Sequence, residues 1–314
     1  MFINATGFYI PSQRVSNDYF LEISGLTRDW IFKRTGIESR SKVTEDETGV
    51  EMGIEAVKRA MENLPYSTKD IDAIVSAGYT PIDTVGTLAH VVQKEFEMKN
   101  AMSLMVSSAC SSFVNALEII EGYFASGKAE KALIVCSEQN SYYSNEADQQ
   151  SGYLWGDAAV AMFISKEKQA ENEPEILNIT SRGLGHVGKG PKGVYLSLKD
   201  KGLVMPDGRD VFINATKYMI DAITTVTSRI GITPKDLDYL IAHQANIRIV
   251  NNVLHQLDFP EEKSLNNIQN YGNTGSASAF LVMMEHQQKF QKGSYVGITV
   301  FGGGYSSGAV LIRF

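Results

Sequence analysis

Residues 69–75 read Lys-Asp-Ile-Asp-Ala-Ile-Val, and residues 235–241, which begin 166 positions later, read Lys-Asp-Leu-Asp-Tyr-Leu-Ile. In both copies an apolar run of strand length follows a short polar stretch. A second pair of segments, Ala132–Val135 and Gly297–Val300, recurs at a spacing of 165. This repetition indicates a diverged duplication. Because strand patterns alternate with helical patterns in each copy, the sequence predicts an α/β protein with a mostly parallel sheet covered by helices.

A cysteine lies where one of these apolar runs passes into a helical pattern. Residues 107–113 read Ser-Ser-Ala-Cys-Ser-Ser-Phe, so that Cys110 follows the strand-like run 102–106 and precedes apolar residues at helical spacing. A thiol at a helix N-terminus is expected to have a pKa below its usual ~8.5, because the helix dipole favours the thiolate. Cys110 is therefore a candidate nucleophile, although a lone cysteine among small residues is more often a buried core residue.

Two polar residues of the second copy fall at comparable positions. His243 follows the strand-like run that ends at Ala242, and the loop around Asn273 matches the Cys110 segment at the same spacing. In such sheets ligands bind beyond the carboxyl ends of the strands, so two related halves could bring these three residues together. Cysteine, histidine and asparagine together indicate acyl-thioester chemistry. Taken singly, His243 could be a core histidine and Asn273 a turn residue.

With these residues in place, the chain resembles the thiolase-fold condensing enzymes, and among them the beta-ketoacyl-acyl-carrier-protein synthases III. The stretches that carry the resemblance are Asp29–Ile37, the Cys110 segment, Gly156–Ala159, His243–Ile249, Gly272–Thr274 and Phe301–Tyr305. The resemblance implies a thiolase-like fold, in which two duplicated βαβα halves, residues 1–166 and 167–314, pack as a five-layered αβαβα sandwich. The charged run 166–174 would separate the halves, or form a surface loop within one sheet.

The resemblance also implies an activity and a set of partners. Cys110 would take an acyl group from a thioester, with the backbone N–H groups of Cys110 and Gly304 holding the oxyanion. His243 and Asn273 would stabilise the enolate that forms when a malonyl thioester loses carbon dioxide. The primer would arrive on coenzyme A or on the phosphopantetheine of acyl carrier protein, and the enzyme would be a homodimer. The residues implied in substrate and carrier binding are Trp30, Arg34, Phe212, Ala245 and Arg248.

Several residues depart from the pattern of the housekeeping synthase. Gln149 stands near the usual place of an arginine that stacks on adenine, Glu38 replaces a basic residue and Arg209 replaces an asparagine. Loss of the stacking cation and addition of an acid near phosphates would weaken coenzyme A binding, which favours a primer carried on protein. In the segment 79–89, expected to contribute to the partner's tunnel, Ile82, Asp83 and Val85 replace a phenylalanine. Smaller residues there predict a longer or branched acyl chain.

Composition is consistent with this assignment and excludes other classes. The 43% hydrophobic and 21% charged residues are typical of a globular protein, and two cysteines give no disulfide framework, which favours the cytoplasm. The net charge of −7 argues against nucleic-acid binding, and no apolar run is long enough for membrane insertion. The glycines of 183–188 match a dinucleotide pattern, but no helical pattern follows them, so no bound cofactor is expected. The histidines show no metal-ligand spacing.

Two other functions remain open at this stage. A relative of the same fold could pass the acyl group from Cys110 to an alcohol or an amine, but such a transfer needs no enolate stabiliser, and Asn273 is present. A non-catalytic subunit of a heterodimeric synthase would have no use for a nucleophile, and Cys110 is present.

Overall fold

The structure is a computed structural model that describes residues 1–199 and 202–314. One run of nine hydrogen-bonded strands, in the order β11-β12-β13-β8-β1-β7-β6-β4-β5, forms its frame. These strands are β1 (Phe2–Tyr9), β4 (Ala73–Ala77), β5 (Met102–Val106), β6 (Lys131–Glu138), β7 (Ala158–Ser165), β8 (Glu175–Gly183), β11 (Tyr239–Ala242), β12 (Tyr295–Gly302) and β13 (Ser306–Arg313). Two small antiparallel ribbons accompany them, β2 (Gln13–Ser16) with β3 (Ser39–Lys42), and β9 (Tyr195–Ser197) with β10 (Gly202–Val204).

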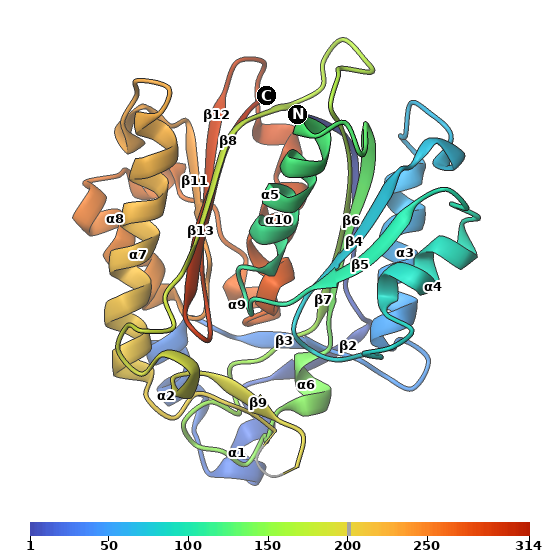
Figure 1. Ribbon diagram of the computed structural model, residues 1–314. Coiled ribbons are helices and arrows are strands. Elements are labelled where there is room, and N and C mark those ends of the chain that lie inside the picture. The colour runs from blue at the N-terminus through green and yellow to red at the C-terminus, as the bar shows by residue number, and fades with distance from the viewer. Residues whose placement is uncertain (200–201) are drawn as a thin grey trace.

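The helices lie in three layers around this frame. They are α1 (Tyr19–Ser24), α2 (Arg28–Thr35), α3 (Gly49–Met61), α4 (Leu88–Glu95), α5 (Ser112–Ala125), α6 (Asn140–Tyr143), α7 (Gly208–Ser228), α8 (Ile247–Leu257), α9 (Ile268–Tyr271) and α10 (Ser278–Glu285). Figure 1 shows α5 and α10 in the middle, with β11, β12, β13 and β8 on one side and β1, β7, β6, β4 and β5 on the other. Helices α7 and α8 cover one outer face, and α3 and α4 cover the other. The predicted five-layered αβαβα sandwich is confirmed.

The duplication is visible in the pairing of the strands. In the first copy β1 pairs antiparallel with β7, β7 antiparallel with β6, and β6 parallel with β4. In the second copy β8, β13, β12 and β11 repeat this series with the same directions. An isolated parallel bridge between Leu240 and Ser264 stands where the first copy has β5. The two sheets meet through one pair of residues, Phe2 and Glu175.

The expectation of a mostly parallel sheet was wrong. Three of the eight strand pairs are parallel and five are antiparallel. The reason is the last connection in each copy, which has no crossover helix. Strand β12 ends at Gly302 and β13 begins at Ser306, so the chain turns back as a hairpin.

Three apolar clusters hold the layers together. The largest lies around α5 and α10, where the rings of Phe113 and Phe280 stack with centroids 4.0 Å apart. A second cluster lies between α7, α8 and the sheet of the second copy, and a third lies between α3, α4 and the sheet of the first. Because Phe113 opens α5 and Phe280 lies in the first turn of α10, this stack fixes the two copies to each other near the start of both central helices.

A group of short elements covers one end of both sheets. Helices α1, α2 and α6 and the ribbons β2–β3 and β9–β10 gather there, opposite the end at which both termini lie (Figure 1). In the chain, the β9–β10 hairpin of this group lies between β8 and α7. No helix in the described part of the chain is long and apolar enough to cross a bilayer.

Candidate active site

Cys110 lies in a tight turn between β5 and α5, as the sequence predicts. The residue before it, Ala109, has a φ of +51°, in the left-handed region that side chains other than glycine seldom adopt. The turn is held by Ser112, whose Oγ accepts from the backbone N–H of Ser108 over 2.9 Å. The end of β12 packs directly against this turn, because a Cβ on Gly302 would lie 2.6 Å from the carbonyl oxygen of Ser108 and 2.9 Å from the backbone nitrogen of Cys110. Glycine at 302 therefore lets the second copy reach the nucleophile.

The predicted low pKa of Cys110 was wrong. Burial, and after it the carboxylate of Glu138, raise the pKa of the thiol to about 12. The backbone N–H groups of Cys110 and Gly303 lower the pKa, but they do not offset burial. A helix dipole is worth about 1 kcal/mol at an exposed site, which is less than the cost of placing a thiolate in an apolar environment beside a carboxylate. The resting side chain is therefore a thiol, which would have to lose its proton to act as a nucleophile.

The phenol of Tyr79, in the loop after β4, lies within hydrogen-bonding reach of the Cys110 sulfur. It also donates to Oδ1 of Asn140 over 2.7 Å. The amide nitrogen of Asn140 is occupied by the carbonyl oxygens of Gly156, at 2.7 Å, and Asn273, at 3.4 Å, so its oxygen must face Tyr79. The contact with Tyr79 lowers the pKa of the Cys110 thiol, but burial outweighs it. Burial raises the pKa of Tyr79 well above its ordinary value.

Glu138, the last residue of β6, ties together loops from both copies. Its carboxylate is fully buried and accepts from the hydroxyls of Thr80 and Ser276, each at 2.6 Å. It also accepts from the backbone N–H groups of Thr80, at 3.1 Å, and Ser276, at 3.3 Å. Burial raises the pKa of Glu138 to about 7, and these donors limit the rise. The carboxylate thereby ties the loop of Tyr79 to the loop of Asn273.

His243 follows β11 and is buried at 3% exposure. Its backbone N–H donates to the carbonyl oxygen of Thr299 in β12 over 2.8 Å, which places it beside the strand that ends at Gly302. Burial lowers the pKa of the imidazole to about 4, so the ring is neutral at physiological pH. Its Nδ1 has no partner among the described residues. A neutral ring is suited to donate one N–H to a developing oxyanion.

Gln244, the next residue, fixes the loop of His243 to the loop of Asn273. Its side-chain oxygen accepts from the backbone N–H groups of Asn267, at 3.0 Å, and Ile268, at 3.2 Å, and its nitrogen donates to the Asn267 side chain. Asn246 then caps α8 by accepting from the backbone N–H of Ile249 over 3.1 Å. The stretch His243–Asn246 thus contains a candidate donor, a clamp and a helix cap.

Asn273 is held by backbone and side-chain contacts on opposite sides. Its backbone N–H donates to the carbonyl oxygen of Leu154 over 2.8 Å, and its carbonyl oxygen accepts from Gly156 over 3.0 Å. The side-chain oxygen accepts from the backbone N–H of Gly275 over 3.1 Å. With that oxygen occupied, the amide is oriented so that its NH₂ group is the end left to donate. This is the arrangement an enolate oxygen requires.

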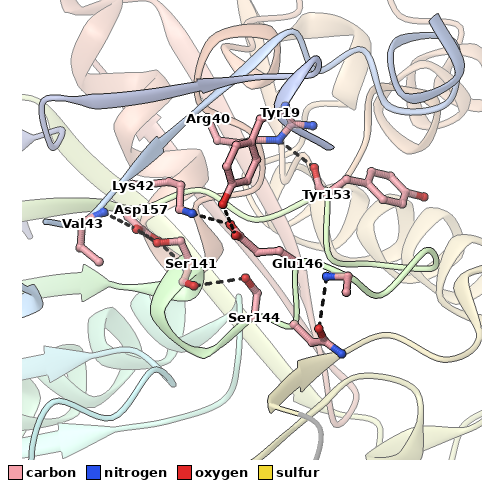
Figure 2. Close-up of polar contacts among 11 residues, drawn as sticks. Tyr19, Arg40, Lys42, Val43, Ser141, Ser144, Glu146, Tyr153 and Asp157 are labelled. Carbon is pink, nitrogen blue, oxygen red and sulfur yellow. Dashed lines mark hydrogen bonds and ion pairs between the residues drawn. The ribbon is translucent and has the colours of Figure 1, made fainter. Parts of the chain in front are cut away.

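A cluster of polar contacts around Asp157 and Glu146 follows Asn140 in the chain (Figure 2). Asp157 accepts from the backbone N–H of Ser141 over 2.8 Å, from the Ser141 hydroxyl over 2.5 Å and from the backbone N–H of Val43 over 2.7 Å. Burial raises the pKa of Asp157 to about 6. Nearby, Glu146 pairs with Lys42 over 2.5 Å. These contacts fix α6, which begins at Asn140, to the ribbon strand β3.

Three of the five predicted substrate and carrier residues line one open cavity of about 390 Å³. Arg34, Phe212 and Arg248 line it, and Trp30 lies behind Arg34, with the guanidinium 3.9 Å from the centre of the indole ring. Ala245 does not line this cavity but packs against the apolar cluster of the second copy.

Two of the three residues that depart from the housekeeping pattern, Gln149 and Glu38, do not line this cavity. The side chain of Gln149 donates to the carbonyl oxygen of Ser24 over 2.8 Å, whereas Gln150 lines the cavity. Of these two glutamines, only Gln150 lines the entry cavity. Arg209 lines the cavity as expected, but Glu38 is exposed and is not among the lining residues.

Four residues of the site were missed in the sequence: Tyr79, Glu138, Asn140 and Gln244. Glu138 and Asn140 follow a strand that the repeat identifies, and a charged residue at the end of an apolar run was a usable signal. Tyr79 offered no such signal, because a tyrosine after a strand is common on protein surfaces. Its approach to Cys110 depends on the fold.

The chain matches known proteins over its whole length. Residues 105–183 match the family described as 3-oxoacyl-[acyl-carrier-protein (ACP)] synthase III, and residues 227–314 match that described as its C-terminal part. Beta-ketoacyl-[acyl-carrier-protein] synthase III of Aquifex aeolicus is 31% identical over 99% of both chains, and that of Clostridium perfringens is 33% identical over 98% of this chain and 97% of its own.

Solved structures agree with these matches. The Aquifex aeolicus enzyme superposes with a TM-score of 0.92 over 100% of this chain and 99% of its own. The priming beta-ketosynthase of the R1128 polyketide pathway is 28% identical and superposes with a TM-score of 0.89 over 99% of this chain and 95% of its own. The fold, the duplicated strand order and these similarities agree, and the chain belongs to the 3-oxoacyl-[acyl-carrier-protein] synthase III family.

Proposed function

We propose that this chain is an acyltransferase of the 3-oxoacyl-ACP synthase III type, which condenses an acyl thioester primer with malonyl-ACP and releases carbon dioxide. The observation that carries the proposal is the orientation of Asn273. Its side-chain oxygen is bound to Gly275, so that its NH₂ group remains free to donate. Transfer of an acyl group to an alcohol or an amine creates no enolate and has no use for this donor, which makes that alternative the weaker one.

In the first half-reaction the Cys110 sulfur bonds to the thioester carbon of the primer. The bond from that carbon to the donor sulfur breaks, and the proton of the Cys110 thiol leaves with the donor thiol. We assign the oxyanion of this step to backbone N–H groups of Cys110 and of the glycines that follow β12. Gly303 directs its N–H toward the sulfur, and Gly304 has a φ of +111°, which only glycine readily adopts.

In the second half-reaction a malonyl thioester loses carbon dioxide, and the electron pair of the broken bond forms an enolate. We assign the stabilisation of its oxygen to the neutral ring of His243 and the amide of Asn273. The enolate carbon attacks the acyl carbon on Cys110, the bond to sulfur breaks, and the thiol regains a proton. The product is a 3-oxoacyl thioester. No step requires a metal or a redox cofactor.

The open cavity beside Arg34 and Phe212 is the proposed entry for the pantetheine arm. Arg34, Arg209 and Arg248 place three cations on its lining, which suits the phosphates of coenzyme A or of a carrier-protein arm, and the acidic surface of a carrier. Trp30 contributes by holding Arg34. Both donors share this arm, and we expect the uncharged Gln150 to favour the carrier protein.

We also propose a homodimer formed along β5. This strand is the last in the sheet order, so one of its edges has no partner strand among the described residues. It reads Met-Ser-Leu-Met-Val and is partly exposed along its length, with Met102 37% exposed. An apolar edge strand left open is a site of aggregation unless a second strand covers it. A shift to monomers in light scattering on Leu104→Lys would support this interface.

The test of the proposed function uses purified protein with acetyl-CoA and malonyl-ACP. Mass spectrometry should detect 3-oxobutanoyl-ACP, with one carbon dioxide released for each product formed. Formation of acyl-Cys110 without decarboxylation, together with acyl transfer to an added alcohol or amine, would favour the other acyltransferase.

A further inference from the structure

The side of the site beyond the Cys110 sulfur is occupied by an unusual pair of side chains. Tyr79 is a large residue in the loop after β4, and Asn140 begins α6 after β6. They are joined by the 2.7 Å hydrogen bond between the phenol and the amide oxygen. Both belong to the first copy, as do Arg34, Gln150 and Tyr153 of the entry cavity. Because Tyr79 lies within hydrogen-bonding reach of the Cys110 sulfur, an acyl group carried on that sulfur lies next to its ring.

A second cavity, of about 550 Å³, lies along the same two loops. Its lining includes Ile82, three residues after Tyr79, and Gln139, immediately before Asn140, together with Val43, Val50, Tyr142 and Tyr143. Five of its ten lining residues are apolar or aromatic, and the others are Thr44, Glu45, Thr48, Gly49 and Gln139. This mixed lining lies beside the loops that carry the bonded pair.

Rotating Tyr79 or Asn140 out of place would break several buried hydrogen bonds. Asn140 is fully buried and uses its nitrogen on Gly156 and Asn273. The backbone on the other side is held by Glu138, which accepts from the N–H of Tyr79 over 3.4 Å and of Thr80 over 3.1 Å. Moving Tyr79 would leave the buried amide oxygen of Asn140 without its partner.

Gly275 shows that the ring of Tyr79 fills space near the nucleophile. A Cβ at position 275 would lie 2.7 Å from the Tyr79 hydroxyl oxygen and 3.0 Å from its ring. Glycine at 275, with a φ of +63°, thus leaves room for the tyrosine. Gly275 of the second copy therefore packs directly against Tyr79 of the first.

From this geometry we infer that Tyr79, held by Asn140, is the residue that limits primer length, so that Cys110 accepts short primers of about two to four carbons and excludes longer ones. The inference rests on the proposed function for the identity of the site. It reverses the longer chain expected from the small residues of segment 79–89. Val85, one basis of that expectation, is 85% exposed on this chain.

The experiment measures only the first half-reaction. Wild-type protein and the series Tyr79→Phe, Tyr79→Leu and Tyr79→Ala are mixed with acyl-CoA or acyl-ACP donors of two, four, six and eight carbons. Single-turnover acylation of Cys110 is followed by intact mass spectrometry. Tyr195→Ala removes a tyrosine from the β9 ribbon, far along the chain from the site, and serves as the matched control. Circular dichroism melts show which variants are folded.

Wild-type protein should be acylated by the six-carbon donor at least tenfold more slowly than by the two-carbon donor. The ratio of six-carbon to two-carbon rates should rise at least tenfold in Tyr79→Ala and by less in Tyr79→Leu. Tyr79→Phe keeps the ring but loses the hydrogen bond to Asn140, so its ratio should lie between those of the wild type and Tyr79→Leu. Tyr195→Ala should keep the wild-type ratio. The graded series keeps the test decisive if the alanine variant does not fold, because the leucine variant must then show the change.

Equal acylation of the wild type by two-carbon and eight-carbon donors would overturn the inference. An unchanged ratio in both Tyr79→Leu and Tyr79→Ala would do the same. Failure of the proposed function would look different, since Cys110 would then be acylated with the predicted length preference while no 3-oxoacyl product formed with malonyl-ACP.

Discussion

Oγ of Ser276 donates a hydrogen bond over 2.6 Å to Oε1 of Glu138, and this contact joins the two copies of the fold at the nucleophile. Glu138 ends β6 in the first copy, and Ser276 lies three residues after Asn273 in the second. Through its other carboxylate oxygen Glu138 also holds Thr80, the neighbour of Tyr79. One buried carboxylate therefore holds the loop of Tyr79 and the loop of Asn273 together.

The stability of the protein should depend on pH through Glu138. Its pKa in the fold is about 7, above the 4.5 of an unperturbed glutamate, so between these pH values the native state binds more protons than the unfolded state. The free energy of unfolding should then fall as the pH rises through this window, by at most about 3 kcal/mol from this group. Chemical denaturation at pH 5 and pH 8 measures the fall.

Glu138→Gln removes the titrating group and should lower stability at both pH values, because an amide offers one acceptor oxygen where the carboxyl group offers two to the buried N–H and hydroxyl donors. The gap in stability between wild type and variant should be larger at pH 5 than at pH 8. Glu171→Gln, at an exposed glutamate, is the control and should follow the wild type. A gap that is the same at both pH values would show that Glu138 is ionised throughout.

Cys110 should be slow to alkylate at neutral pH. Because burial raises its pKa to about 12, the thiolate fraction should increase about tenfold with each pH unit from 7 to 10. Iodoacetamide labelling rates, followed by peptide mass spectrometry, should rise in step with that fraction. Cys136 is fully buried and should stay unlabelled while the protein is folded. A rate that levels off by pH 8 would contradict the high pKa.

His243→Ala and Asn273→Ala should separate the two half-reactions. Each removes a donor expected to act on the enolate, so decarboxylation of malonyl-ACP should slow by 10²–10³-fold, or about 3 kcal/mol. Acylation of Cys110 should continue at a substantial rate. Rapid-quench measurements of acyl-enzyme and of carbon dioxide report the two steps separately. If Asn273→Ala leaves product formation unchanged, the amide has no part in condensation.

Gln150→Arg should improve the use of coenzyme A donors. A guanidinium at this position of the entry cavity can stack on adenine or pair with phosphate, which is worth about 1 kcal/mol, or roughly fivefold in the acylation rate. Acyl-ACP donors, which carry no adenine, should gain less.

Gln149→Arg is the matched control, because that side chain is bound to Ser24 and lies outside the cavity lining. Equal gains from both substitutions would point to a general effect of charge. A wild-type enzyme that already prefers acetyl-CoA to acetyl-ACP would show that the cation is not needed.

The sequence by itself determined the repeated unit and the strand ends that carry Cys110, His243 and Asn273. These follow from apolar periodicity and from the spacing of two similar segments, which are local properties of the chain. It misjudged the strand directions, because the hairpin from β12 to β13 replaces a crossover. The hairpin depends on the short turn 303–305. The glycines of that turn have no spacing that distinguishes a hairpin from a crossover.

Only the tertiary structure decided the chemistry around the sulfur. The helix start after Cys110 suggested a thiolate, but burial and the carboxylate of Glu138 outweigh the helix dipole. The approach of Tyr79 to Cys110, and of Gly302 to the turn before it, joins residues that are 31 and 192 positions apart in the chain. Burial and electrostatic interaction depend on distance in space, which no local pattern of residues encodes.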